Sequence, residues 1–227
     1  MSPGSKKLQI AIDGQTAAGK DTVAREVAAA LGCVFIDTGA LYRAAAVQVI
    51  RSGIPVTRPE VIHELLSRTE FSILIDEAAG HNHILVNGED VTALLRTSEI
   101  DALSTLLARQ KDLRVHLIDL QKRIIAQYPR VVVTGRGIGR TVLPDADLKV
   151  YLTAELRERV RRRWEERRRS GHEVALETIE QEILDRDCAN REREFDPDVP
   201  TEDAVRIDTT ERSVESLKQE IISLCKK

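Results

Sequence analysis

The chain has 227 residues, a length that fits one domain with mobile subdomains. Its formal net charge of −3 gives no overall attraction to nucleic acid or to a membrane, and no apolar run approaches the ~20 residues of a membrane-spanning helix. Three distant cysteines without a CxxC pair argue against a disulfide framework or a zinc site and indicate a reducing cytoplasm, and the N-terminus lacks the apolar core of a signal peptide.

The N-terminal segment predicts a strand, a glycine-bounded loop and a helix in succession. An apolar run covers residues 8–13, and alanine-rich helical sequence covers residues 20–31 before Gly32 ends it. The loop between them has the spacing GxxxxGK, which is typical of a phosphate-binding P-loop. The candidate ATP-binding residues are Gly14, Gln15, Thr16, Ala17, Ala18, Gly19, Lys20, Asp21 and Thr22.

The chemistry of this loop favours triphosphate binding over a plain glycine-rich turn. Glycines allow the backbone to curl so that several N–H groups point inward, and the helix N-terminus adds partial positive charge. Lys20 can reach the outer phosphates as a mobile charge, and we expect it to be catalytic. Asp21 replaces the usual Ser or Thr, and phosphates repel a carboxylate unless a metal lies between them. Asp21 and Thr22 are therefore candidate metal ligands.

Strands and helices alternate along most of the remaining chain. We predict strands over residues 34–37, 130–134, 148–152 and 204–207, and helices over 39–51, 61–67, 113–126, 155–169, 175–191 and 213–224. Paired strands over 71–76 and 83–86, separated by residues 77–80 and followed by an Asn-Gly turn, and a helix over 98–108 interrupt this alternation. The fold class is therefore α/β, with a five-stranded parallel sheet in a three-layer α/β/α arrangement.

We expect three parts within a single domain of residues 1–227. The core comprises residues 6–54, 113–156 and 203–227, an insertion comprises 55–112, and a helical lid comprises 157–196.

Polar side chains follow two predicted strands at their carboxyl ends, where open α/β sheets bind ligands. Asp37 ends one strand, and Arg43 lies one turn into the following helix. Arg136 belongs to the sequence GRGIG over residues 135–139, whose spacing does not match a dinucleotide fingerprint. We interpret it as a flexible loop that presents Arg136 to the same crevice. Asp37 or Thr38 can also cap the helix, and both interpretations can hold together.

Residues 157–169 include eight arginines, among which Arg159, Arg162 and Arg163 are spaced to converge on one helix face. With a P-loop present, the preferred interpretation is a lid that clamps phosphates. One alternative is a solvated face balanced by glutamates. Another is a nucleic-acid patch, but the only aromatic residue there is Trp164, so base stacking is poorly supported.

The chain resembles the bacterial cytidylate kinases, a family of P-loop nucleoside monophosphate kinases, from about residue 8 to its C-terminus. The matching segments are IAIDGQTAAGKDTVAREVAAALG, FIDTGALYRAAA, VNGEDVTALLRTSEI, GRGIGRTVLPDADLKVYLTA, RDCANRERE and DAVRIDTT. The segments IDTGALYR and NGEDV with LRT separate this family from adenylate and shikimate kinases. The resemblance implies a P-loop kinase fold and transfer of the ATP γ-phosphoryl group to CMP or dCMP with Mg²⁺.

The resemblance also implies roles for individual residues. Lys20 bridges the donor and the transferred group, and Arg162 acts on the donor from the lid. The insertion binds the acceptor. The implied acceptor-binding residues are Asp37, Thr38, Arg43, Thr105 (or Ser104), Arg114, Arg136, Asn190 and Arg193, and Arg136, Arg162 and Arg186 join Lys20 as catalytic residues.

The sequence departs from the family pattern at three positions. The family usually has Asp where this chain has Thr134, Gly137 and Asn190, and it has Ser or Gly where this chain has Asp21. One hypothesis is that Asp21 takes over metal organisation from the missing strand-end Asp. A second is that the acceptor is UMP or a modified pyrimidine nucleotide, because a carboxylate distinguishes the cytosine amino group from the uracil carbonyl.

Three other functions stay open at this stage. They are a P-loop kinase of another small molecule, a nucleotide-binding regulator that has lost catalysis, and an RNA-binding protein that uses the arginine-rich helices. The expected partners are ATP and a pyrimidine monophosphate, without nucleic acid or membrane, and the resemblance implies a cytoplasmic monomer.

Overall fold

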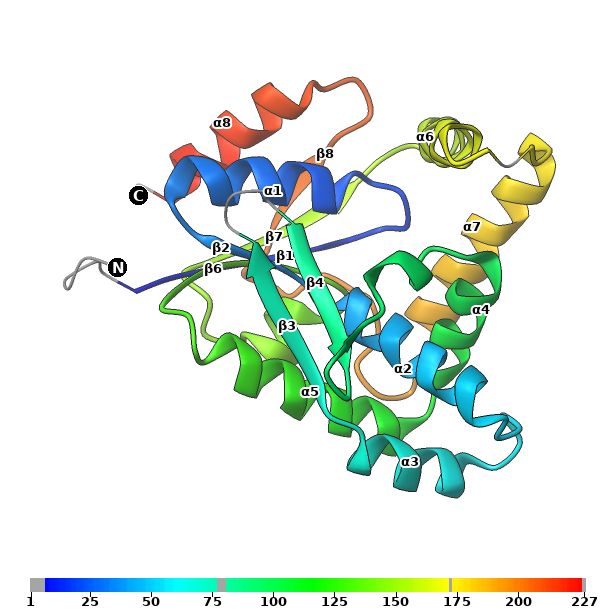
Figure 1. Cartoon of the computed structure of the whole chain (residues 1–227). Helices are drawn as coiled ribbons and strands as arrows, with labels where there is room; N and C mark the ends of the chain where they lie inside the picture. Colours follow the sequence, from blue (N-terminus) through cyan, green and yellow to red (C-terminus); the bar gives the residue numbers. More distant parts are fainter. Residues whose placement is uncertain (1–6, 77–80, 172, 226–227) are drawn as a thin grey trace.

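A five-stranded parallel sheet forms the centre of the computed structural model, which describes residues 7–76, 81–171 and 173–225 (Figure 1). The strand order is β2-β6-β1-β7-β8, and each neighbouring pair is parallel. The strands are β1 (Leu8–Gly14), β2 (Val34–Asp37), β6 (Arg130–Thr134), β7 (Leu148–Thr153) and β8 (Val205–Asp208). The predicted α/β class and five-stranded sheet are confirmed.

Helices cover both faces of this sheet because its central strands are apolar on both sides. Ile10 and Ile12 of β1 pack in one hydrophobic cluster with residues of α1 (Lys20–Leu31) and α8 (Val214–Leu224). Ala11, between them, belongs to the opposite cluster with α2 (Gly39–Ser52) and α5 (Lys111–Ile125). This alternation along one strand produces the expected three layers.

The segment between α2 and α5 forms a small α+β unit. It contains α3 (Pro59–Arg68), the antiparallel strands β3 (Phe71–Asp76), β4 (His81–Val86) and β5 (Glu89–Asp90), the short helix η1 (Thr92–Leu94) and α4 (Ser98–Leu107). The sequence predicted the β3–β4 pair but not β5 or η1, which are too short to show a period. The predicted connection at residues 77–80 lies outside the described residues.

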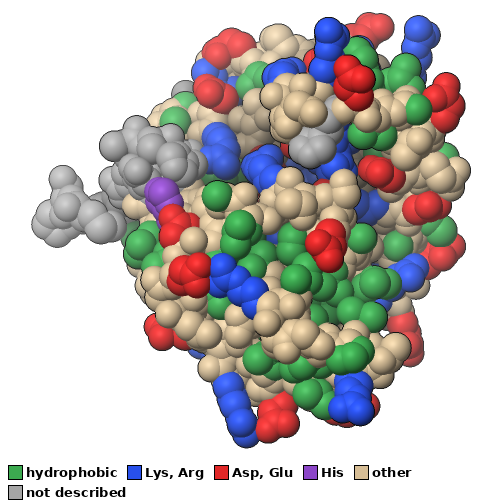
Figure 2. Space-filling model, turned by 45° about the vertical axis from the view of Figure 1, so that its right-hand side comes forward, with side chains coloured by type: hydrophobic (Ala, Val, Ile, Leu, Met, Phe, Trp, Pro, Cys, Tyr) green, Lys and Arg blue, Asp and Glu red, His purple; other side chains and the backbone are tan. Residues whose placement is uncertain are grey.

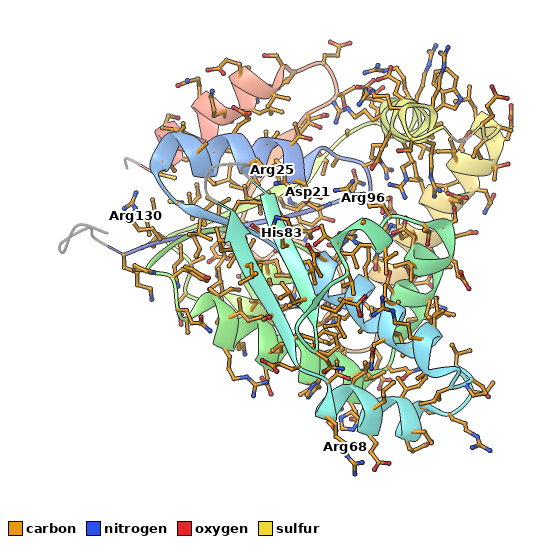
Figure 3. All side chains as sticks on the ribbon, viewed as in Figure 1. Asp21, Arg25, Arg68, His83, Arg96 and Arg130 are labelled. Atoms are coloured by element: carbon orange, nitrogen blue, oxygen red, sulfur yellow. The ribbon has the colours of Figure 1, made fainter. Side chains whose placement is uncertain are left out.

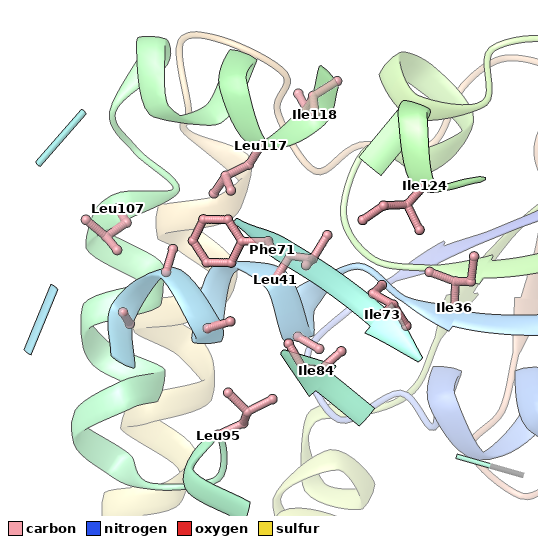
Figure 4. Close-up of a cluster of buried hydrophobic side chains, with 14 of the residues drawn as sticks. Ile36, Leu41, Phe71, Ile73, Ile84, Leu95, Leu107, Leu117, Ile118 and Ile124 are labelled. Carbon is pink, nitrogen blue, oxygen red and sulfur yellow. The ribbon is translucent and has the colours of Figure 1, made fainter. Parts of the chain in front are cut away.

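This unit is not separated from the rest of the core. Phe71, Ile84 and Leu107 lie in the same buried cluster as Leu41 of α2 and Leu117 of α5 (Figure 4). Shared packing of this kind places the inner surface of the unit next to α2.

The arginine-rich helix α6 and the following helix α7 lie together at one end of the molecule (Figure 1). α6 (Leu156–Arg169) and α7 (Leu176–Arg191) pack around a small cluster of their own, made by Val160, Ile179 and Ile183. The core contains far more buried side chains, so this pair has less apolar packing to hold its position. Among the residues described, no helix combines the length and the apolar character needed to cross a membrane.

Residues 135–137 of the GRGIG sequence form the expected loop at the end of β6, and Arg136 lines the cavity described below, but the whole sequence is not a flexible loop. Its last residues begin η2 (Ile138–Val142), a short π-helical turn. Both carboxylate oxygens of Asp13 accept hydrogen bonds from this turn, from the amides of Ile138 and Gly139, each at 2.8 Å. The prediction was wrong because this anchor comes from β1, which is 125 residues earlier in the chain than Ile138.

Candidate functional site

The P-loop connects β1 to α1, as the motif predicts. Gly14 has φ of +145°, and a Cβ atom there would lie 2.2 Å from the carbonyl oxygen of Leu152 on β7. Only glycine fits so close to the neighbouring strand. Gly19 ends the loop with φ of +86°, and α1 begins at Lys20. The loop backbone therefore lies at the N-terminal end of α1, where its amides and the helix dipole favour an anion.

Lys20 is folded over this loop. Its Nζ donates hydrogen bonds to the carbonyl oxygens of Gly14 and Gln15, both at 3.0 Å. Burial, together with the smaller effect of the nearby charge of Arg136, lowers the pKa of Lys20 to about 8. A phosphate group beside this ammonium would raise the pKa again, because an anion offsets both effects.

The lid helices contact the loop directly. Arg162 of α6 donates to the hydroxyl (2.9 Å) and carbonyl (2.6 Å) oxygens of Thr209, and its Nη1 lies 3.5 Å from the position of a Cβ on Gly19. Arg162 is thus beside the donor end of the P-loop. Arg159 donates to the carbonyl oxygen of Thr16 at 3.3 Å and pairs with Asp187 of α7.

The predicted convergence of the three α6 arginines is wrong. Arg159 and Arg162 contact different parts of the P-loop region, and Arg163 instead pairs with Asp101 of α4 at 2.6 Å. Their partners belong to three distant segments, so helical spacing alone could not assign them. Asp187, which accepts the amide proton of Thr16 at 3.1 Å, is a residue of this site that the sequence analysis missed.

A cavity of about 60 Å³ lies beside α2. Seven of the eight predicted acceptor-binding residues line it, together with Arg186. These residues are Thr38, Arg43, Thr105, Arg114, Arg136, Asn190 and Arg193. The eighth, Asp37, is outside the lining but holds Arg43 with a 2.6 Å ion pair. The space-filling view shows many Lys and Arg side chains gathered across the upper part of the face that it presents (Figure 2).

The end of the cavity nearest the P-loop has an excess of positive charge. Arg136 donates to the hydroxyl of Thr16 at 2.8 Å and pairs with Asp198. Arg186 has its nearest paired carboxylate, that of Asp101, at 4.0 Å. Burial lowers the pKa of Arg186 to about 10, with the charges of Arg136 and Arg43 acting in the same direction. A half-buried arginine without close compensation is a site for an anion such as a phosphate.

The other end of the cavity contains a closed ion pair beside the guanidinium of Arg193. Arg114 pairs with Asp196 and also donates to the hydroxyl of Tyr42 (3.2 Å) and to the carbonyl oxygen of Arg136 (3.0 Å). Tyr42 and Gln121 also line the cavity. Tyr42, Gln121, Asp196 and Asp198 were not among the predicted site residues. Tyr42 belongs to the segment IDTGALYR, so the motif was a signal for it, whereas the other three neither follow a strand nor belong to a motif discussed above.

The two candidate metal ligands lie on the first turn of α1. The hydroxyl of Thr134, at the end of β6, donates to the carboxylate of Asp21 at 3.0 Å, and Asp21 lies near the N-terminal end of α1 in Figure 3. Thr22 is exposed on the same turn. Within the described ranges, no cluster of three or more His, Cys, Asp or Glu side chains is arranged to hold a metal ion. Mg²⁺ needs fewer, since one or two carboxylates with substrate phosphates and water suffice.

The arrangement therefore joins two anion sites. The P-loop with Lys20 and Arg162 forms one, and the cavity with Arg43 and Arg186 forms the other. Arg136 contacts both, through Thr16 and through the cavity wall. A phosphoryl group held between the two sites would meet cationic side chains on either side, which is what phosphoryl transfer requires.

Comparisons with known proteins agree with this geometry. The protein-family model described as cytidylate kinase matches residues 10–227. A cytidylate kinase of Bacillus velezensis is 42% identical over 219 residues, which cover 96% of this chain and 96% of that protein. The cytidylate kinase of Symbiobacterium thermophilum is 41% identical over 227 residues, which cover all of both chains. That of Desulfitobacterium hafniense is 39% identical over 219 residues, which cover 96% of this chain and 93% of that protein.

Solved structures support the fold alone. A gluconokinase from Sinorhizobium meliloti has a TM-score of 0.50 at 15% identity, with 98% of this chain and 94% of that chain covered. An uncharacterized protein from Eubacterium ventriosum has a TM-score of 0.51 at 15% identity, with 97% and 99% covered.

Proposed function

The chain belongs to the cytidylate kinase family, and from this premise we propose that it transfers the γ-phosphoryl group of ATP to CMP or dCMP, giving CDP or dCDP. The observation that carries the proposal is Arg136, which links the hydroxyl of Thr16 in the P-loop to the wall of the cavity beside α2. A single guanidinium that contacts both anion sites is suited to stabilise a group that passes between them.

Each group of site residues has its own role in this transfer. The P-loop backbone and Lys20 bind the donor phosphates, and Arg162 approaches them from the lid. Arg43, Arg136 and Arg186 bind the acceptor phosphate and neutralise the charge that spreads over the transferred group. No general base is required, because a monophosphate oxygen is already anionic. Closure of α6 and α7 over the P-loop would exclude water from the reaction.

The residues around Asp21 fit Mg²⁺. Carboxylate and hydroxyl oxygens are its preferred protein ligands, and the Thr134 hydroxyl orients the Asp21 carboxylate at 3.0 Å. Burial raises the pKa of Asp37, and the charge of Asp21 adds to this rise, so a cation beside Asp21 would also relieve repulsion between the two carboxylates. When bound with ATP, Mg²⁺ neutralises charge on the β- and γ-phosphates. We assign its binding to Asp21, with Thr22 as a second candidate.

We also propose that the protein acts as a monomer in the cytoplasm, on small-molecule nucleotides. Its three cysteines are free thiols, which fits a reducing compartment. The arginine-rich face of α6 is partly neutralised by its own glutamates, since Arg161 pairs with Glu158 and Glu165. Such pairing argues against an RNA-binding patch, which needs uncompensated positive charge.

The test is a panel of nucleoside monophosphates given to the purified protein with ATP and Mg²⁺. ADP formation with CMP and dCMP is the expected result. ATP binding without ADP formation on any acceptor would instead indicate a regulator that lacks catalysis. Phosphorylation of a different small molecule alone would assign another P-loop kinase activity.

A further inference from the structure

The two ends of the acceptor cavity differ in how their charges are paired, and this difference assigns them to different parts of a nucleotide. Near the P-loop, Arg136 pairs with Asp198, whereas Arg186 has its nearest paired carboxylate at 4.0 Å, so this end keeps positive charge. At the other end, Arg114 lines the cavity and forms a closed ion pair with Asp196, and the two side chains are 3% and 0% exposed. A neutral pair of donor and acceptor is suited to the uncharged polar edge of a base, and the cationic end is suited to its phosphate.

The Asp196 carboxylate is only half satisfied. Its Oδ2 accepts two hydrogen bonds from Arg114, one of them from Nε at 3.1 Å. Its Oδ1 is buried and has no hydrogen-bond partner among the described residues. The same holds for Nδ2 of Asn190 and Nη2 of Arg193, which belong to residues that line the cavity. Buried polar groups are costly when unpaired, so this cluster indicates a ligand with complementary polar atoms.

The position of Asp196 depends on Gly137. A Cβ atom on Gly137 would lie 2.3 Å from Oδ1 and 2.7 Å from Cγ of Asp196, so the carboxylate occupies the space that a side chain at residue 137 would need. Asp196 itself has φ of +55°, a left-handed conformation that Asp tolerates better than most residues. The loop after α7 thus delivers a carboxylate to a place that β6 and η2 leave free.

We propose that Asp196 is the specificity-determining residue of the acceptor site, and that it selects a base with an amino group at the edge facing the Arg114–Asp196 pair. Cytosine presents an amino donor next to acceptor atoms, which matches a carboxylate beside a guanidinium. Uracil presents a carbonyl oxygen at the same place, and the buried negative charge would repel it. The inference rests on the proposed function and identifies the residue that makes the acceptor a cytidine nucleotide.

The test compares kcat/KM for CMP and UMP in the wild type and in Asp196→Asn. The substitution keeps the shape of the side chain and removes its charge. We expect the CMP/UMP ratio of kcat/KM to fall by about ten- to a hundred-fold, the range that a good base contact contributes. Asp198→Asn is the matched control, because it lies two residues away and pairs with Arg136 instead. It should slow both acceptors alike and leave the ratio unchanged.

A second variant moves the carboxylate instead of removing it. Gly137→Asp combined with Asp196→Ala puts the acid group into the same space from residue 137, just before η2, and truncation at residue 196 removes the clash. Residue 137 has φ of +78°, a conformation that Asp tolerates better than most residues. We expect this double variant to regain much of the CMP/UMP ratio that Asp196→Ala loses. Because the double variant keeps a carboxylate near Arg114, it tests the role of that carboxylate even where Asp196→Asn prevents folding.

Three results would overturn the inference while leaving the kinase activity intact. They are a wild-type enzyme without preference for CMP over UMP, an Asp196→Asn variant with an unchanged ratio, and a double variant no more selective than Asp196→Ala. A wild-type protein that phosphorylates no nucleoside monophosphate would refute the proposed function itself, and the inference with it.

Discussion

Thr134 donates its hydroxyl proton to the carboxylate of Asp21 at 3.0 Å, and so joins the end of β6 to the first turn of α1. The two residues are 113 positions apart in the chain. From the family resemblance we expected an acid at the strand end, where this chain has Thr134. The Asp21 carboxylate instead approaches that strand end from the helix, which is the arrangement that the metal hypothesis requires.

Replacing Asp21 with Ala is therefore expected to weaken Mg²⁺ use. The Mg²⁺ concentration for half-maximal activity should rise by about ten- to a hundred-fold, because a metal-organising carboxylate is lost. Titration of activity against Mg²⁺ at saturating ATP measures the shift. Asp21→Ala with Thr134→Asp should regain most of it, since the acid then lies on β6. An unchanged Mg²⁺ dependence in Asp21→Ala would remove Asp21 from the metal site.

Lys20→Ala should reduce kcat by about 10³-fold or more, because a cation at the transferred phosphoryl group stabilises the transition state. Thermal stability should not fall, since burial already disfavours the Lys20 ammonium and lowers its pKa to about 8. Steady-state kinetics and a melting curve check the two parts separately. Lys218→Ala, which breaks the ion pairs of α8 with Glu215 and with Glu26 of α1, is the control and should keep the wild-type rate. A near-wild-type rate in Lys20→Ala would contradict the kinase assignment.

Arg186→Ala should impair the acceptor more than the donor. Its guanidinium lines the cavity and lacks a close carboxylate, so its charge is available for the acceptor phosphate. We expect kcat/KM for CMP to fall by about 10³-fold, while the Kd for ATP changes little. Kinetics with CMP and calorimetry with ATP test this split. The exposed Arg191, near the end of the same helix, provides the control Arg191→Ala. A larger loss in ATP affinity than in CMP use would place Arg186 in the donor site.

We predict that Asp13 makes the free energy of unfolding depend on pH. Burial raises its pKa from 3.8 to about 6, although the amides of Gly139 and Ile138 oppose the rise. The folded state then holds a proton that the unfolded chain releases, so this stability is present at low pH and is lost as pH rises through 6.

The free energy of unfolding of the wild type, relative to Asp13→Asn, should therefore increase as pH falls from 7 to 5, by roughly 1 kcal/mol. Urea unfolding at several pH values measures the difference between the two proteins. The Asn variant cannot titrate at this position and provides the baseline. A difference that stays constant, or that grows toward higher pH, would show that the Asp13 pKa is not raised.

Short-range patterns predicted much of the architecture. The β1–loop–α1 segment, the five core strands and the helices α2, α5, α6 and α7 agree with the sequence to within a few residues. These elements depend on apolar periods and glycine positions within a dozen residues, which a single chain displays directly. Seven of the eight predicted acceptor residues also line one cavity. Thr38, Arg43 and Arg136 meet there because residues that follow parallel strands lie at the same edge of the sheet, whereas the other four were implied by the family resemblance.

The chain by itself thus determined the P-loop, the alternation of strands and helices and the basic residues of both anion sites. Only the tertiary structure decided which acidic side chain pairs with which hydrogen-bond donor. Arg114 pairs with Asp196 across 82 positions, Arg136 with Asp198 across 62, and Thr16 with Asp187 across 171. No local period records such pairs, because they form only where the lid helices and the loop after them fold back onto the sheet. Electrostatic pairing at a buried site follows from three-dimensional proximity, and the order of residues along the chain carries no trace of it.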